Sequence, residues 1–242
     1  MIPFIESGIP GFDELTRSKD GTGGIPENSS TLIYGPVKTG KTIFSNQFAY
    51  HGLLNNDPCL YITTDRGFNQ LESMMFDLGL PIEKFVKNKT FYLIDTTSDI
   101  SEGRLQQTEN IIPSYINNPT DIMVKVGSGI HYVYKNNPRF RSVLDSTTTL
   151  LAYNENMLIV RVLKAYLMRI NEAGGTPIIT YTEDSADLIV ETMLKSMVDN
   201  IIRLDGDELT VEAMNGIGKR KALYQITENG NLLIIYNNLM RM

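Results

Sequence analysis

Residues 35–42 read GPVKTGKT, which matches the pattern G-x-x-x-x-G-K-[ST] of a phosphate-binding loop. Glycines at both ends of such a loop let successive backbone N–H groups point into one concavity, where a side chain would crowd the phosphates. The start of the next helix adds to the same anion site. We therefore predict that Lys41 bridges the β- and γ-phosphates of a nucleoside triphosphate and that Thr42 ligates Mg²⁺. The predicted nucleotide-binding residues are Gly35, Pro36, Val37, Lys38, Thr39, Gly40, Lys41, Thr42 and Ile43.

The sequence on either side of the loop supplies the strand and the helix that such a loop requires. Residues 31–34 (TLIY) are β-prone, and residues 41–54 contain no proline and place Phe44, Phe48 and Ala49 at helical spacing. A glycine-rich turn with an incidental lysine is the alternative. The order of strand, loop and helix favours a phosphate-binding loop.

Strand-like and helical segments alternate along the rest of the chain. Expected strands cover 31–35, 59–65, 90–95, 140–145 and 176–182, and expected helices cover 41–54, 67–78, 103–117, 155–173 and 187–197. This alternation predicts an α/β fold, with a mostly parallel sheet covered by helices on both faces. In the helix expected at 155–173, the predicted apolar face comprises Leu158, Val162, Tyr166 and Ile170.

The two ends of the chain do not share this alternation of strands and longer helices. Residues 1–30 are rich in glycine and proline, which predicts a lead-in of turns with one short helix at 12–16. Short strands are expected at 200–205, 208–214, 221–227 and 231–236, with turn signals at 205–207 and 228–231. We therefore expect antiparallel C-terminal strands that extend the same sheet. Without a linker, the chain is expected to form one domain over 1–242, with a lead-in (1–30), a core (31–204) and a β extension (205–242).

Composition narrows the function classes. The net charge of −6 and the pI near 5.0 provide no overall electrostatic attraction to nucleic acid. Cys59 is the single cysteine, which excludes an internal disulfide, fits a cytoplasmic setting and suggests a buried packing residue. No apolar stretch approaches the ~18 residues of a membrane span, and no signal peptide is recognisable at the N-terminus. The two histidines, His51 and His131, lack metal-ligand spacing.

A magnesium site needs a carboxylate near the loop. Residues 140–145 (FRSVLD) form an apolar strand that ends in Asp145, at the edge of the sheet where ligands of α/β proteins bind. We expect this strand to run beside the strand of the phosphate-binding loop. Asp145 is then predicted to hold Mg²⁺ directly or through water. An aspartate that only caps a turn or helix is the alternative.

The chain resembles the KaiC-like branch of the RecA superfamily of ATPases, which is common in archaea. The resemblance rests on GIPGFDEL, GGIP, GPVKTGKT, PCLYITTD, SVLDSTTTL, TPIITYTE, MVDNIIRLD and YQITENGNLLI, which follow the family's order and rough spacing. It covers most of the chain and is weakest at 96–138. It implies a single KaiC-type domain with a RecA-like core, ATP and Mg²⁺ as ligands, and a ring, typically a hexamer, with nucleotide between subunits.

The chain departs from the family where the attacking water is activated. The family carries one or two glutamates after its second strand, and here Asp65 and Arg66 stand at those positions. Asp65 is the candidate catalytic base, but its shorter side chain reaches less far, and such a misplacement can cost about a hundredfold in rate. Arg66 cannot act as a base and could instead bind phosphate or a neighbouring acid. An exposed loop pair is the alternative for both.

Two further family positions differ or stay ambiguous. The family ends a late strand with KxRG, whose basic residues reach the neighbouring subunit's nucleotide, whereas Ala213 and Asn215 stand here. The basic run 219–221 could substitute, or could form a solvated turn. Thr182 and Glu183 occupy the family's polar sensor positions near the γ-phosphate, which makes Glu183 a second candidate catalytic residue. A surface or capping role for Glu183 is the alternative.

Three functions follow from these residues. The first is a weak, slow Mg-dependent ATPase whose ATP or ADP state regulates an unknown protein partner. The second is an ATP-binding module without turnover. The third is a recombinase paralogue on DNA, for which the mix of aromatic and basic residues at 124–141 is the local support. A hairpin or strand face is the favoured interpretation of 124–141, and DNA is not the favoured partner.

Overall fold

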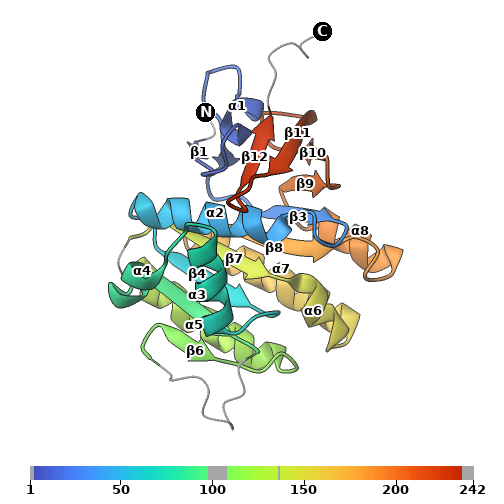
Figure 1. The fold of residues 1–242 in the computed structure, drawn as a ribbon. Coiled ribbons are helices and arrows are strands. Elements are labelled where there is room, and N and C mark those ends of the chain that lie inside the picture. Colours follow the sequence, from blue (N-terminus) through green and yellow to red (C-terminus); the bar gives the residue numbers. More distant parts are fainter. Residues whose placement is uncertain (1–2, 98–107, 136, 236–242) are drawn as a thin grey trace.

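The computed structural model describes residues 3–97, 108–135 and 137–235, in which the main sheet has ten strands (Figure 1). In sheet order the strands are β12 (Leu232–Ile235), β11 (Arg220–Ile226), β10 (Glu208–Ala213), β9 (Asn200–Leu204), β3 (Thr31–Gly35), β8 (Gly175–Thr182), β7 (Phe140–Asp145), β4 (Cys59–Thr63), β5 (Phe91–Asp95) and β6 (Ile111–Pro113). All neighbours from β9 to β6 are parallel, and the pairs from β9 to β12 are antiparallel. The predicted parallel core with an antiparallel extension is confirmed.

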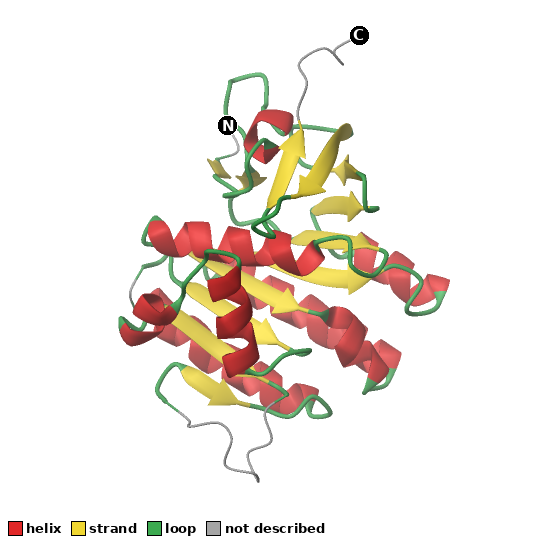
Figure 2. Ribbon diagram, in the orientation of Figure 1, coloured by secondary structure: helices red, strands yellow, loops and turns green. Residues whose placement is uncertain are grey.

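Helices cover both faces of the parallel core (Figure 2). One face carries α2 (Lys41–Leu54), α3 (Phe68–Asp77) and α4 (Glu83–Lys87), and the other carries α5 (Pro119–Tyr134), α6 (Thr147–Ala152), α7 (Asn156–Glu172) and α8 (Leu188–Ser196). Strand β3 shows why both faces are covered. Ile33 packs in the hydrophobic cluster on the face of α2, whereas Leu32 and Tyr34 pack in the cluster on the face of α7. Successive side chains of a strand point to opposite faces, so a strand apolar at every position needs cover on both.

Two expectations for the middle of the chain are wrong. The helix expected at 103–117 is contradicted in its described part, because Ile111–Pro113 forms the edge strand β6; residues 103–107 lie outside the described residues. The segment at 124–141 is not a hairpin, since its first part lies in α5. Helix α5 begins at a capping Asn118, whose side chain accepts from the Asp121 N–H at 3.0 Å. The glycines inside α5 interrupt the helical spacing of its apolar residues. Packing against β4 and β5 stabilises the helix.

Helix α7 was placed correctly, but its predicted apolar face was shifted. Leu158 is 43% exposed, whereas the buried stripe contains Ile159, Leu163, Tyr166 and Ile170. A run of strict four-residue steps drifts by about 40° per step around a helix, so it leaves the buried face after two or three steps. The mixed spacing of four, three and four residues follows the core instead.

The lead-in is more structured than the turns suggested. Strand β1 (Phe4–Ile5) pairs antiparallel with β2 (Ile25–Pro26), and the short helix α1 (Phe12–Leu15) lies where a helix was expected. Phe12 packs edge-on against Phe44 of α2, with ring centroids 5.2 Å apart. The Ile234 N–H donates to the Pro10 carbonyl at 2.9 Å, which joins the lead-in to β12. In the described part of the chain, no helix is both long and apolar enough to span a bilayer.

Candidate nucleotide-binding site

The loop GPVKTGKT joins β3 to α2 at the carboxyl edge of the sheet. Its backbone enters the left-handed region at Lys38 (φ 63°) and Gly40 (φ 96°), which curls the chain into the expected concavity. Gly35 is required for a reason other than the one expected. A Cβ atom at Gly35 would lie 1.9 Å from the Leu204 carbonyl oxygen, so the neighbouring strand β9 excludes a side chain there.

Lys41 lies along the inside of this loop. Its ammonium donates to the Gly35 carbonyl at 2.9 Å and to the Pro36 carbonyl at 2.5 Å. Burial lowers the pKa of Lys41, and the nearby carboxylates of Asp145 and Glu183 oppose that shift. Among the residues that the structure describes, only neutral carbonyls hold this cation at short range, in a site where an anion would stabilise its charge.

Asp145 ends β7 and is buried beside the start of α2. Its carboxylate accepts from the Thr180 hydroxyl at 2.6 Å. Burial raises the pKa of Asp145, while hydrogen bonds from Thr180 and Thr42 oppose the rise. Thr42 and Asp145 therefore lie close together on one cavity, and oxygen donors of this kind fit the ligand preference of Mg²⁺. Among the described residues no group of three or more His, Cys, Asp or Glu could hold a metal, so phosphate or water oxygens would complete the site.

The expectation that β7 runs beside β3 is wrong. Strand β8 lies between them, and β3 pairs with β8 and β9. The two strand ends still reach one site, because Thr180 of β8 sits between them and hydrogen bonds to Asp145. Strand order depends on contacts between elements far apart in the chain, which no local pattern records.

Asp65 lies in the loop after β4. Its carboxylate accepts from the Ser146 hydroxyl at 3.1 Å and from the Thr149 hydroxyl. The neighbouring Thr64 N–H donates to the Asp145 carbonyl at 2.9 Å, which ties this loop to the end of β7. Sequence reasoning did not single out Ser146 or Thr149. The run of hydroxyl residues directly after Asp145 was the signal that could have indicated them.

These elements enclose one cavity of about 460 Å³. It is lined by the loop residues Val37, Lys38, Thr39, Gly40, Lys41, Thr42 and Ile43, by the polar residues Asp65, Arg66, Asp145, Ser146, Thr180 and Thr182, and by the apolar residues Met74, Leu78 and Ile226. The structure thus brings together the predicted loop, Asp65 and Asp145.

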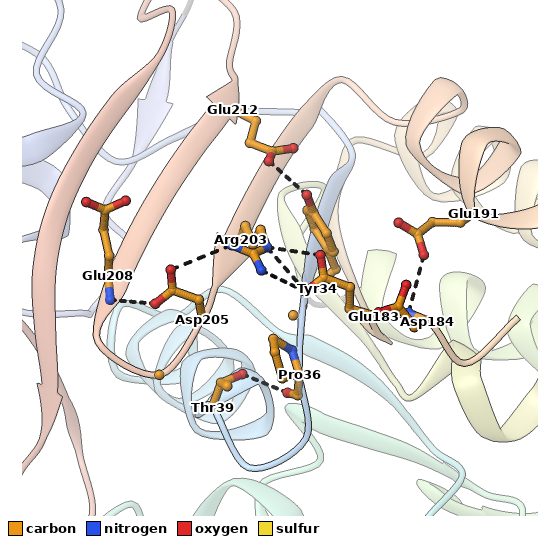
Figure 3. A network of polar contacts seen from close by, with 12 residues as sticks. Tyr34, Pro36, Thr39, Glu183, Asp184, Glu191, Arg203, Asp205, Glu208 and Glu212 are labelled. Carbon is orange, nitrogen blue, oxygen red and sulfur yellow. Dashed lines mark hydrogen bonds and ion pairs between the residues drawn. The ribbon is translucent and has the colours of Figure 1, made fainter. Parts of the chain in front are cut away.

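Glu183 does not line this cavity. Its carboxylate is gripped by the Arg203 guanidinium, with N–O distances of 3.1 and 3.0 Å, on the β9 side of the loop (Figure 3). Its backbone N–H donates to the Gly35 carbonyl at 2.9 Å. Glu183 therefore lies close behind the loop, and its charge reaches Lys41.

The C-terminal strands brace the loop from outside. The Tyr224 hydroxyl of β11 donates to the Thr39 carbonyl at 2.7 Å and accepts from the Gly206 N–H at 2.9 Å. The Gln47 side chain of α2 bonds both backbone groups of Leu232 in β12, at 2.8 and 3.2 Å. The antiparallel extension therefore helps to set the shape of the loop.

Replacing Tyr224 with phenylalanine is expected to weaken nucleotide binding about fivefold, because one buried hydrogen bond contributes about 1 kcal/mol to holding the loop in shape. Calorimetric titration with MgATP measures the change. Tyr166→Phe is the matched control, since its buried hydroxyl contacts Ser142, with an O–O distance of 2.7 Å, on the other face of the sheet. Equal losses of affinity in both variants would show that the brace has no specific effect.

The fold and the loop between β3 and α2 place this protein in the class of RecA-like P-loop proteins. A family profile described as "ATPase: KaiC" matches residues 5–226, and the chain therefore belongs to the KaiC ATPase family. This confirms the resemblance drawn from the motifs. The chain is thus an ATP-binding protein of the RecA superfamily.

Relatives and a solved structure are similar to this chain over different shares of their length. A UPF0273 protein of Thermotoga maritima is 29% identical over 98% of this chain and 97% of its own length. The circadian clock oscillator protein KaiC of Prochlorococcus marinus is 33% identical over 96 residues, which cover 39% of this chain and 18% of that protein. The crystal structure of a KaiC-like protein from Pyrococcus horikoshii has the same fold, with a TM-score of 0.73 at 23% identity over 98% of this chain and 100% of the other.

Proposed function

We propose that the protein is a slow Mg-dependent ATPase whose nucleotide state regulates its interaction with a protein partner. The observation that carries the proposal is the meeting of Lys41, Thr42 and Asp145 in one cavity. We further propose that residues 1–242 act as one domain in the cytoplasm, and that copies of the chain assemble into a ring. Regulation of a partner and ring formation rest on membership of the KaiC family.

Each residue of the site has a different role in the proposed reaction. Lys41 would exchange the Gly35 and Pro36 carbonyls for oxygens of the β- and γ-phosphates. Thr42 and Asp145 would hold Mg²⁺, directly or through water, and the ion would neutralise charge on the phosphates. The Tyr224 brace supports the loop N–H groups that face the nucleotide.

Slow turnover is supported by the state of the candidate base. Asp65 would accept the proton of the attacking water, but it already accepts hydrogen bonds from Ser146 and Thr149. A carboxylate held by two hydroxyl groups is less free to reach the attacking water. Glu183 is proposed as a sensor of the γ-phosphate. Its ion pair with Arg203 holds it just outside the cavity.

An ATP-binding module without turnover is the second candidate. The same hydroxyl contacts to Asp65 favour it, as do the residues at the end of β10, where Ala213 and Asn215 supply no cation for a neighbouring nucleotide. A recombinase paralogue acting on DNA is the third candidate; the first part of its supporting segment, 124–141, is α5, which buries Val126 and Val133 against the sheet.

ATP hydrolysis under steady-state and single-turnover conditions separates the first two candidates. We expect slow Mg-dependent turnover that falls about a hundredfold in Asp65→Ala, within the usual contribution of a general base. Asp77→Ala, which removes an exposed carboxylate from the end of α3, is the control. A rate per subunit that rises with protein concentration would support assembly. Binding of ATP without turnover in the wild type would favour the binding module.

A further inference from the structure

Arg66 occupies the cavity wall that faces the loop. It follows Asp65 in the segment between β4 and α3, is half-buried, and lines the same cavity as Lys41 and Thr42. Its charge reaches Asp145, where it is one of the influences that lower the pKa of that carboxyl. Besides Lys38 and Lys41 of the loop, the cavity therefore contains a third cationic side chain, to which the proposed function assigns no role.

The guanidinium of Arg66 makes no hydrogen bond or ion pair within the described residues, whereas other arginines do. Arg139 and Arg141 both contact Asp57, and Arg203 grips Glu183. A half-buried guanidinium without a partner is costly, because it has lost part of its hydration with no compensating acceptor. An anionic ligand in the cavity would supply the missing acceptors.

The backbone around Arg66 is fixed on both sides. The Thr63 hydroxyl donates to the Arg66 carbonyl at 2.6 Å. The Phe68 N–H, at the start of α3, donates to the Asp95 carboxylate at 2.7 Å. Together with the tie from Thr64 to the end of β7, these bonds hold the segment in place over the cavity. The backbone that carries Arg66 is therefore preorganised, which lowers part of the entropic cost of binding a ligand.

We propose that Arg66 binds the γ-phosphate of ATP within the same chain, so that the site distinguishes ATP from ADP. The proposal rests on the proposed function, because it requires the loop to hold the nucleotide. The loop N–H groups and the start of α2 hold the inner phosphates. The terminal phosphate then faces the residues across the sheet edge, where β4 delivers Arg66 beyond Asp145.

The chemistry of the two groups matches. A guanidinium presents parallel N–H donors that fit two oxygens of one phosphate, and it stays charged at all physiological pH values. ADP lacks the phosphate that Arg66 would contact. A protein that switches a partner by its nucleotide state needs a contact that ATP makes and ADP does not, because a ligand shifts a conformational equilibrium only by binding one conformation better than the other.

The test compares the affinities of full-length wild type and Arg66→Gln for ADP and for the β,γ-imido analogue of ATP, by calorimetry with Mg²⁺. We expect Arg66→Gln to weaken the ATP analogue about tenfold, the effect of losing a hydrogen bond to a charged group, and to change ADP affinity less than about twofold. Arg66→Lys is expected to recover part of the loss. Arg161→Gln, on the exposed side of α7, is the matched control.

The outcomes separate this inference from the function on which it rests. If wild type binds both nucleotides but Arg66→Gln weakens them equally, or weakens neither, Arg66 does not bind the γ-phosphate and only this inference fails. An equal loss would place Arg66 on the base, ribose or inner phosphates. If wild type binds neither nucleotide, the proposed function fails and the inference fails with it.

Discussion

Replacing Lys41 with alanine is expected to weaken MgATP binding about a hundredfold. The ammonium is positioned inside the loop by the Gly35 and Pro36 carbonyls, which a bound phosphate would replace. Two charge-assisted hydrogen bonds of about 1.5 kcal/mol each give about 3 kcal/mol, which corresponds to about a hundredfold in affinity. Calorimetric titration with MgATP measures this loss, and it needs no turnover.

The fold is expected to survive the Lys41→Ala change. Burial lowers the pKa of Lys41, which means that folding disfavours its charged form, so losing the ammonium offsets losing its two carbonyl contacts. Thermal unfolding should therefore resemble that of the wild type. Lys164→Ala, on the exposed side of α7, is the control for a lost surface charge. Unchanged affinity in Lys41→Ala would show that the loop does not hold the phosphates of ATP.

Replacing Asp57 with alanine is expected to cost about 3–5 kcal/mol in the free energy of unfolding, the range found when one partner of a buried ion pair is removed. Asp57 and Arg141 are both 2% exposed, with Oδ2 and Nε 3.4 Å apart. The Arg141 guanidinium also donates to the Phe48 carbonyl at 2.9 Å and lies over the Phe48 ring. Without Asp57, this buried cation keeps no carboxylate partner in the described part of the chain.

Denaturant titration measures the loss in Asp57→Ala, and nucleotide binding provides the contrast. Asp57 precedes β4 and Arg141 lies near the start of β7, at the sheet edge opposite Asp145, so the folded variant should keep its affinity for MgATP. Glu83→Ala is the control, because its pairing with Lys87 is exposed and should add nothing measurable to stability. A stability equal to that of the wild type would mean that the buried pair is replaced without cost by other contacts.

Of these two predictions, the first concerns a residue that a local motif identifies, and the second concerns a pair that no local motif identifies. Lys41 is part of a local pattern whose geometry is set by adjacent residues, and its place between a strand and a helix follows from the residues on either side of the loop. Asp57 and Arg141 are 84 positions apart and show no local sign of pairing. The antiparallel tail was likewise predictable, because short apolar runs and turn signals such as 228–231 are local features.

The wrong predictions concern a helix with a weak local pattern and a strand order that depends on contacts between residues far apart in the chain. Helix α5 contains Gly127 and Gly129, which interrupt its apolar period, and Gly129 is buried against Leu60 and Tyr92. Its helical state is therefore set by packing on the sheet and by the cap at Asn118. The insertion of β8 between β3 and β7 is a matter of strand order, which depends on which faces pack together.

The sequence by itself determined that residues 35–42 form a loop of the phosphate-binding pattern, that the core is a parallel sheet covered on both faces, and that the tail extends it. These properties follow from backbone conformation and from the periodicity of apolar side chains, both of which are local. Only the tertiary structure decided that Thr42 meets Asp145, that Ser146 and Thr149 hold Asp65, and that Arg66 stays unpaired in the cavity among the described residues. Those contacts depend on strand order and register, which are set by packing across the whole sheet.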